Sequence, residues 1–284
     1  MGDVARQTAA TLEDDGRYSA MVHRDWEIWG PCGGYVAAIA LRAAGAESPF
    51  ARPASFFCHY LSVADFAPVD LLVTPLRSGR TVLAQRVEMT QEGRPVLQAM
   101  VWSVGEVEGL AHEDLVPPDV ADPEDVLPPP PEPPPEPGED RPRYAFWDNF
   151  DQRPLNWVQP WPPAEPLPPV YRTWVRYRAG SPGTGSDGAT PDPWVDAARL
   201  LVVLDVMSWP AGSRPHAYQE HAFIAPSLDL YAAFTGLASG SEWLLLDAHS
   251  PVAASGLLSW TGRVWSRDRR LLASGGGQAV FRRM

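Results

Sequence analysis

Residues 192–209 read DPWVDAARLLVVLDVMSW, an apolar segment that carries the carboxylate of Asp205 close to its end. Asp192 is a suitable N-cap for a helix, and Pro193 suits the first helical turn, where an N–H group has no partner to lose. Because the segment is apolar on nearly every side, the helix that it predicts must be buried all round. A sheet wrapped around the helix would cover all of its faces.

The sequence on either side of this helix supplies strands for such a sheet. Strand character is found after the helix at 227–236, 241–254, 256–268 and 269–282, and before it at 169–178. A helix followed by four strands predicts an antiparallel unit in the second half of the chain.

The first half of the chain repeats this order. Residues 33–45, GGYVAAIALRAAG, predict a second buried helix with Gly45 as its C-terminal stop. Four strand segments follow at 54–64, 68–79, 80–91 and 94–104. The segment that starts at Ser55 corresponds to the one that starts at Ser227. We therefore expect an α+β protein of two tandem units whose sheets join into a longer one.

Residues 105–143 separate the two units. Proline and acidic residues dominate this stretch, and no apolar period survives in it, which favours an extended, semi-rigid spacer. We place the N-terminal unit at 1–104, the linker at 105–143 and the C-terminal unit at 144–284.

Composition and motifs exclude several kinds of function. The net charge of -12 argues against a nucleic-acid-binding protein, and the absence of lysine excludes Schiff-base chemistry and a lysine-containing P-loop. The six histidines have no metal-binding spacing and the two cysteines form no CxxC pair, so we expect no metal and no cofactor. No apolar run is long enough to span a membrane and no signal peptide is present, so we expect a cytoplasmic protein without membrane association.

Motifs in both halves resemble one known family, the acyl-CoA thioesterase II-type proteins. In the first half these are WGPCGGYVAAIALRAAG at 29–45 and the strand run that begins with SFFCHYLSV at 55–63. In the second half they are LDVMSWP at 204–210, APSLDLYAAF at 225–234 and the run from EWLLLDAHSP at 242–251 onward. The resemblance covers nearly all of the chain except the linker. It implies a double hotdog fold, in which each of two tandem units wraps an antiparallel sheet around a long apolar helix.

The resemblance also implies an active site. In that family an Asp near the end of the second helix, a Thr or Ser at the start of the next strand and a Gln in the last strand hold a water against the thioester carbonyl. The corresponding residues are Asp205, Ser227 and Gln278, although Ser stands where Thr is common and the glycine run before Gln278 is unusually long. The implied reaction is hydrolysis of an acyl-CoA or related acyl thioester to acid and thiol, as part of lipid metabolism.

The residues themselves leave these roles open. A charge on an apolar helix is costly unless it is paired or hydrogen-bonded, so Asp205 is either a general base that polarises a water or a tie between the helix end and the next loop. Asp229 is a rival carboxylate, or a buried partner for an arginine. The glycines before Gln278 would let a substrate or a helix pass close to the backbone, with Gln278 facing a ligand.

The first half offers substrate contacts rather than a second complete site. Cys-Gly-Gly begins its helix, so the N–H groups of Gly33 and Gly34 could polarise a thioester oxygen, but no carboxylate corresponds to Asp205. Cys32 as a nucleophile is a weaker hypothesis, because no His can be placed beside it. Residues that would contact the acyl chain, or would simply belong to the core, are Trp26, Trp29, Tyr35, Phe57 and Tyr60, with Gly277 as a further contact. Arginines that could bind CoA phosphates, or simply face solvent, are Arg77, Arg80, Arg176 and Arg178.

Two other functions fit the same sequence. A non-catalytic protein of this fold would bind an acyl thioester without turning it over. A hydratase or dehydratase would pair an Asp with a nearby His, for which Asp205 and His216 are the nearest candidates, but a proline-bearing loop separates them. The resemblance further implies a homodimer or a higher oligomer.

Overall fold

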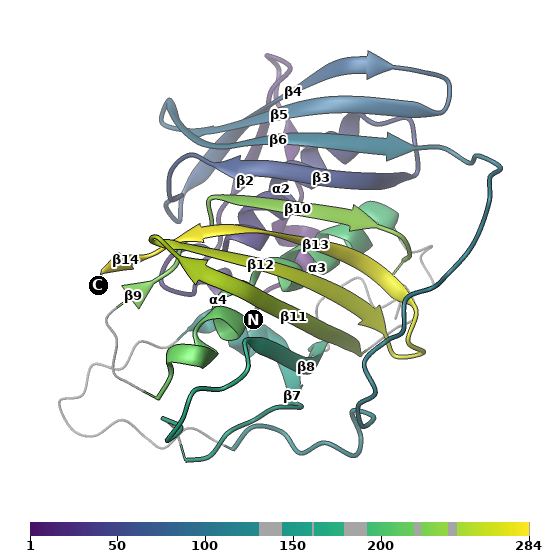
Figure 1. Ribbon diagram of the computed structural model, residues 1–284. Helices are drawn as coiled ribbons and strands as arrows, with labels where there is room; N and C mark the ends of the chain where they lie inside the picture. Colours follow the sequence, from purple (N-terminus) through teal and green to yellow (C-terminus); the bar gives the residue numbers. More distant parts are fainter. Residues whose placement is uncertain (131–143, 161, 179–191, 219–222, 238–242, 284) are drawn as a thin grey trace.

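The structure is a computed structural model that describes residues 1–130, 144–160, 162–178, 192–218, 223–237 and 243–283. One sheet of twelve antiparallel strands runs through these residues, in the order β1-β2-β4-β5-β6-β3-β10-β13-β12-β11-β8-β7 (Figure 1). The first half contributes β1 (Thr11–Leu12), β2 (Tyr18–Met21), β3 (Arg52–Tyr60), β4 (Pro68–Ser78), β5 (Val82–Gln91) and β6 (Arg94–Val104). The second half contributes β7 (Phe150–Pro154), β8 (Val170–Tyr177), β10 (Asp229–Phe234), β11 (Leu244–Ala254), β12 (Leu257–Ser266) and β13 (Leu271–Val280).

The two halves join through equivalent strands. β3 and β10 lie side by side at the centre of the sheet and pair antiparallel, with Cys58 opposite Leu230. The amide of Tyr60 continues this pairing by donating to the carbonyl of Leu228 at 2.9 Å. The prediction of two units with one continuous sheet is therefore confirmed.

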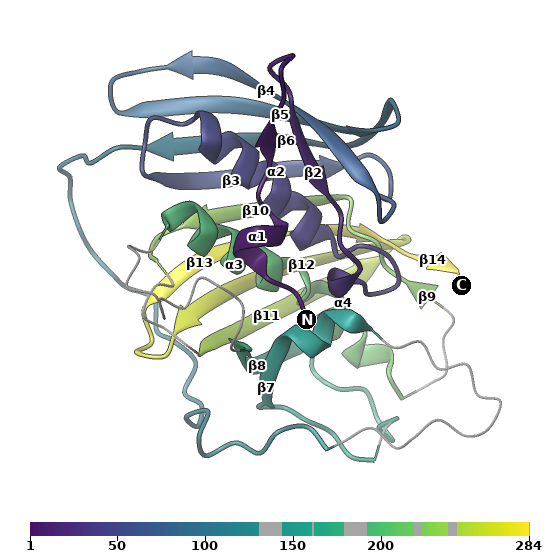
Figure 2. The ribbon, with the colours of Figure 1, turned by 180° about the vertical axis from the view of Figure 1, so that it is seen from behind.

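Two long helices pack together on one face of the sheet, as the view from behind shows (Figure 2). They are α2 (Gly33–Glu47) and α3 (Pro193–Asp205). Glycines allow their close approach, since a Cβ at Gly34 would lie 2.8 Å from the carbonyl oxygen of Leu201, and one at Gly45 would lie 2.6 Å from the ring of Trp194. The prediction that Gly45 stops α2 was wrong, because this glycine makes room for Trp194 and the helix continues beyond it.

The second helix begins as predicted and ends earlier. Asp192 caps α3 by accepting a hydrogen bond from the amide of Trp194 at 2.8 Å, and Pro193 occupies the first turn. The helix stops at Asp205, and a separate short helix, α4 (Ser208–Gly212), follows. Pro210 has no N–H with which to continue the ladder of α3, so it fits only into the first turn of a new helix. This break puts Asp205 at a helix end.

Part of the predicted linker packs on the C-terminal half. The described residues 105–130 contain no helix or strand, and residues 131–143 lie outside the described part. The guanidinium of Arg269 donates to the carbonyls of Pro118 and Val120 and stacks over the ring of Trp174, 5.0 Å from its centroid. The indole of Trp174 in turn donates to the carbonyl of Ala121 at 2.9 Å. Residues 118–121 are thus held against the outer face of the sheet rather than serving only as a spacer.

Short elements complete the fold. They are α1 (Val4–Gln7), the 3-10 turns η1 (Arg24–Trp26), η2 (Ala145–Asn149) and η3 (Arg214–His216), and the two-stranded pair of β9 (Phe223–Ile224) with β14 (Arg282–Arg283). Neither α1 nor β2 was predicted from the sequence. None of the helices in the described ranges is long and apolar enough to cross a membrane.

Candidate active site

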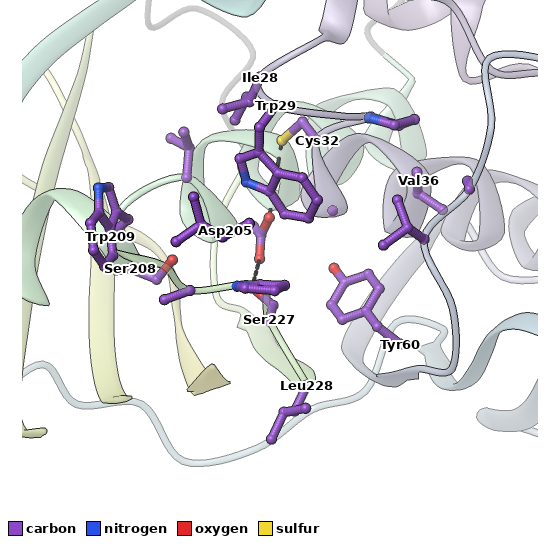
Figure 3. A pocket seen from close by; sticks show the side chains of 18 of the residues that line it. Ile28, Trp29, Cys32, Val36, Tyr60, Asp205, Ser208, Trp209, Ser227 and Leu228 are labelled. Carbon is purple, nitrogen blue, oxygen red and sulfur yellow. Dashed lines mark hydrogen bonds between the residues drawn. The ribbon is translucent and has the colours of Figure 1, made fainter. Parts of the chain in front are cut away.

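A pocket of about 310 Å³ lies where α2, the end of α3 and the central strands meet (Figure 3). Its wall is largely apolar and includes Trp29 and Trp209. Within the described residues the lining contains one carboxylate, Asp205, and one arginine, Arg282. An apolar pocket of this size with few polar groups is typical of a small-molecule site.

Asp205 is the polar centre of the pocket. The residue is only 6% exposed, and both of its carboxylate oxygens accept hydrogen bonds. Oδ2 accepts from the amide of Gly34 at 2.7 Å, and Oδ1 accepts from the hydroxyl of Ser227 at 3.2 Å. Burial raises the pKa of Asp205 to about 6, and the hydrogen bonds from Gly34 and Ser227 limit the rise. The carboxylate is therefore ionised at neutral pH and still basic enough to take a proton.

The amide of Gly34 belongs to the first turn of α2, where N–H groups have no partner within the helix. The positive end of the helix dipole favours the Asp205 carboxylate at this place. Asp205 thus also ties the end of one helix to the start of the other. The expectation that the Gly34 amide is free to polarise a thioester oxygen was wrong, because Asp205 already accepts from it. The amide of Gly33 donates to no acceptor in the part of the chain that the structure describes.

Gln278 is close to the site only through its backbone. Its carbonyl accepts from the amide of Leu228 at 2.7 Å, but its side chain is exposed and does not line the pocket. The reason is the alternation of β13. A Cβ at Gly275 would meet Leu204 of α3 at 2.7 Å, so Gly275 and Gly277 share the inner face and Gln278 points to the other side. The structure brings Asp205 and Ser227 together, but not Gln278.

The carboxylate of Asp229, the rival candidate, is hydrogen-bonded to the backbone of β13. Its Oδ1 accepts from the amide of Gln278 at 3.0 Å, and it does not line the pocket. No arginine pairs with it among the residues described.

Tyr60 is a polar group whose importance the sequence did not reveal. We expected it to contact an acyl chain or to belong to the core. It lines the pocket, and its hydroxyl is buried without a hydrogen-bond partner in the described residues. Burial and the nearby carboxylate of Asp205 raise its pKa well above its usual range, so the hydroxyl keeps its proton.

Four other expected substrate contacts do not line the pocket, namely Trp26, Tyr35, Phe57 and Gly277. Tyr35 is fully buried in the core, where its ring stacks on Trp26 at 5.3 Å and its hydroxyl donates to the carbonyl of Gln7. Phe57 is on the opposite face of β3 from Tyr60 and packs edge-on against His59. Neither side chain lines the pocket, whereas Trp29 does. Gly277 is not among its lining residues either.

The arginines suggested for CoA phosphates are also away from the pocket. Arg176 and Arg178 both pair with Asp151, and neither Arg77 nor Arg80 is part of the lining. Arg282 of β14 does line it, and no carboxylate pairs with Arg282 in the described ranges. The sequence alone does not predict that Arg282 lines the pocket, because this depends on the pairing of β14 with β9.

The Cys32 thiol has the wrong surroundings for a nucleophile. Burial raises its pKa, and Asp205 raises it further; its sulfur lies 4.0 Å from Oδ2 of Asp205 as a weak donor. The described residues contain no group of three or more His, Cys, Asp and Glu side chains that could hold a metal.

Two family models match this chain. The acyl-CoA thioesterase N-terminal domain matches residues 22–104, and the acyl-CoA thioesterase C-terminal domain matches residues 123–280. A comparison with curated protein sequences gave no match.

Solved structures share the fold along the whole chain. An acyl-CoA thioesterase II from Mycobacterium marinum is 20% identical, with 99% of this chain and 98% of that chain covered and a TM-score of 0.77. A protein of unknown function with a hot dog fold from Alicyclobacillus acidocaldarius is 20% identical, with 99% of this chain and 98% of that chain covered and a TM-score of 0.75. The dehydratase domain of PpsC from Mycobacterium tuberculosis, in complex with C12:1-CoA, is 15% identical, with 100% of each chain covered and a TM-score of 0.51. The double hotdog fold is confirmed.

Proposed function

This chain belongs to the acyl-CoA thioesterase family, and we propose that it hydrolyses acyl-CoA with a water molecule that Asp205 activates. The observation that carries the proposal is a buried carboxylate beside a hydroxyl in an apolar pocket. No other carboxylate lines that pocket in the described residues, so Asp205 is the base available there.

Asp205 and Ser227 have different roles in the proposed reaction. Oδ1 of Asp205 has a lone pair left beyond its hydrogen bond from Ser227, so the carboxylate can accept a hydrogen bond from a water in the pocket. The Ser227 hydroxyl donates to Asp205 and can accept from the same water, which fixes the direction of attack.

The reaction then balances without another reactant. The water oxygen bonds to the thioester carbon while Asp205 takes one water proton, which leaves a tetrahedral intermediate with a negative oxygen. When the carbonyl re-forms, the carbon–sulfur bond breaks and the leaving sulfur takes the proton back from Asp205. The products are the acid and the free thiol, and the carboxylate is regenerated.

The pocket supports an acyl thioester as the substrate. Its apolar wall suits an acyl chain, and Arg282 would contact a phosphate group of CoA. We also propose a homodimer or higher oligomer, which light scattering of the purified chain would test.

The second candidate is a non-catalytic acyl-thioester-binding protein. One observation favours it: the Gln278 side chain, the third group of the expected set, does not line the pocket. Such a protein would bind acyl-CoA and release no thiol.

Free-thiol release from short-, medium- and long-chain acyl-CoAs distinguishes these functions. We expect turnover by the wild type, and a loss of about 10²- to 10⁴-fold in Asp205→Asn, the usual contribution of a general base. Asp229→Asn is the matched variant outside the pocket. A loss in Asp229→Asn with an active Asp205→Asn would move the base to Asp229. Binding without thiol release by the wild type would favour the binding protein.

A further inference from the structure

The hydroxyl of Tyr60 is a buried polar group that the protein leaves unsatisfied. It lines the pocket and has no hydrogen-bond partner in the described part of the chain. The Cys58 thiol lies near the Tyr60 hydroxyl on the same face of β3. A thiol is a weak hydrogen-bond partner, and the contact between these two groups does not have the geometry of a hydrogen bond. Burying a donor without a partner costs free energy comparable to a lost hydrogen bond. Such a group in a pocket therefore indicates that a ligand accepts its hydrogen bond.

The backbone holds this hydroxyl beside the proposed base. The Tyr60 amide donates to the carbonyl of Leu228, next in the chain to Ser227, which ties the end of β3 to the start of β10. A Cβ built on Gly33 would lie 3.1 Å from the Tyr60 hydroxyl and 2.9 Å from Oδ2 of Asp205. The two polar groups therefore lie close to the same point beside Gly33 of α2, and Figure 3 shows the Tyr60 hydroxyl directed toward the interior of the pocket.

The two groups have opposite hydrogen-bonding characters. Asp205 is a carboxylate and only accepts, whereas Tyr60 keeps its proton and can donate. Hydrolysis of a thioester needs both, an acceptor for the attacking water and a donor for the carbonyl oxygen that becomes negative. Among the side-chain oxygens and nitrogens of the described lining, the Tyr60 hydroxyl is the one that is fully shielded from solvent and has no hydrogen-bond partner.

We propose that Tyr60 is a catalytic residue that donates a hydrogen bond to the carbonyl oxygen of the thioester and to the oxyanion formed from it. This inference rests on the proposed function. In this proposal β3 of the first half supplies the third polar group of the site. We had expected that group to be Gln278 of β13, in the second half. Gly277 has the inward position of β13 and carries no side chain.

The role requires no proton transfer by Tyr60. As the water oxygen bonds to the carbonyl carbon, the π electrons of the carbonyl move onto its oxygen, and the hydrogen bond from Tyr60 strengthens with that charge. When the carbon–sulfur bond breaks, these electrons re-form the carbonyl and the bond weakens again. The proton cycles only between water, Asp205 and the leaving sulfur.

Tyr60→Phe tests this role, with Tyr231→Phe as the matched control on the outer face of β10. Loss of one oxyanion donor lowers kcat by about 10²- to 10³-fold, and we expect that loss in Tyr60→Phe. Tyr231→Phe should keep the wild-type kcat, since its side chain is 46% exposed and is not part of the pocket. Tyr60→Phe should be at least as thermostable as the wild type, because the hydroxyl that it removes has no partner.

Two CoA analogues provide a readout that a purely structural role would not change. In the first a methylene replaces the thioester sulfur and leaves a ketone, and in the second an alkyl thioether has no carbonyl. We expect Tyr60→Phe to weaken binding of the ketone by at least tenfold and to leave binding of the thioether unchanged. Equal effects on the two analogues would overturn the proposal.

The failure of this inference can be told apart from failure of the proposed function. An active Tyr60→Phe beside an inactive Asp205→Asn would overturn the role of Tyr60 alone. Loss of activity in Gln278→Ala with full activity in Tyr60→Phe would return the donor role to Gln278. A wild type that releases no thiol from any acyl-CoA would reject the proposed function, and the two analogues would still decide whether Tyr60 binds a carbonyl.

Discussion

Asp205→Asn should make the protein more stable at neutral pH while it removes activity. Burial raises the pKa of this carboxyl from 3.8 to about 6, so ionisation is harder in the folded state than in the unfolded chain. The folded state holds its proton more tightly, and stability is lost as the pH rises from about 4 through about 6. A shift of about two pKa units corresponds to about 3 kcal/mol at pH 7.5. Asn avoids this cost and can still accept from Gly34 and donate to Ser227.

Urea unfolding at two pH values measures the effect. We expect the free energy of unfolding of Asp205→Asn, relative to the wild type, to be about 2 kcal/mol higher at pH 7.5 than at pH 4.0. Asp151→Asn should change with the opposite sign. Burial alone would raise the pKa of Asp151, but the hydrogen bonds and charges of Arg176 and Arg178 lower it. A difference between Asp205→Asn and the wild type that does not vary with pH would show that ionisation of Asp205 does not destabilise the folded protein.

Three further predictions concern activity and the linker. The wild-type kcat/KM should fall about tenfold per pH unit below about pH 6, as Asp205 becomes protonated; a flat profile down to pH 5 would exclude it as the base. Arg282→Ala should raise KM severalfold for acyl-CoA but not for the corresponding acyl-pantetheine, which lacks the nucleotide phosphates; equal changes would place the phosphates elsewhere. Arg269→Ala should release residues 118–121 from Trp174, which limited proteolysis would detect as faster cleavage there together with a lower Tm. Unchanged cleavage would mean that the indole of Trp174 is sufficient to hold them.

The sequence predicted the elements of the fold because their signals are local. Asp192 and Pro193 mark the start of α3, and the alternation within the strand segments marks the sheet. Gly45 shows the limit of such signals. A glycine near a helix end is typical of a C-terminal stop, but the same residue is required wherever a second helix approaches closely. Only the position of Trp194 distinguishes the two cases.

The site was predicted in part. Asp205 and Ser227 meet because the end of α3 and the start of β10 are fixed by the fold, and their motifs sit at those places. Gln278 does not join them, because a shift of one residue along β13 moves a side chain to the other face of the sheet. A run of three glycines gives no pattern of apolar and polar residues from which to set that register.

Polar groups contributed by the first half could not be predicted from the sequence. Tyr60 is one aromatic residue in a strand of aromatic residues, and no sequence feature shows that its hydroxyl lacks a partner. The hydrogen bond from Gly34 to Asp205 joins residues 171 positions apart, and it depends on the packing of α2 against α3. Contacts across two units follow from the assembled sheet rather than from local spacing.

A single turnover of an acyl-CoA by the wild-type protein in ¹⁸O-labelled water distinguishes attack by water from attack by a side chain. Direct attack by a water that Asp205 activates predicts one ¹⁸O in the released acid, no label in the protein and no acylated residue at any time. Label in Asp205, or an acyl group on Ser227 or Cys32, would show that a side chain attacks the thioester and that Asp205 does not act by activating a water.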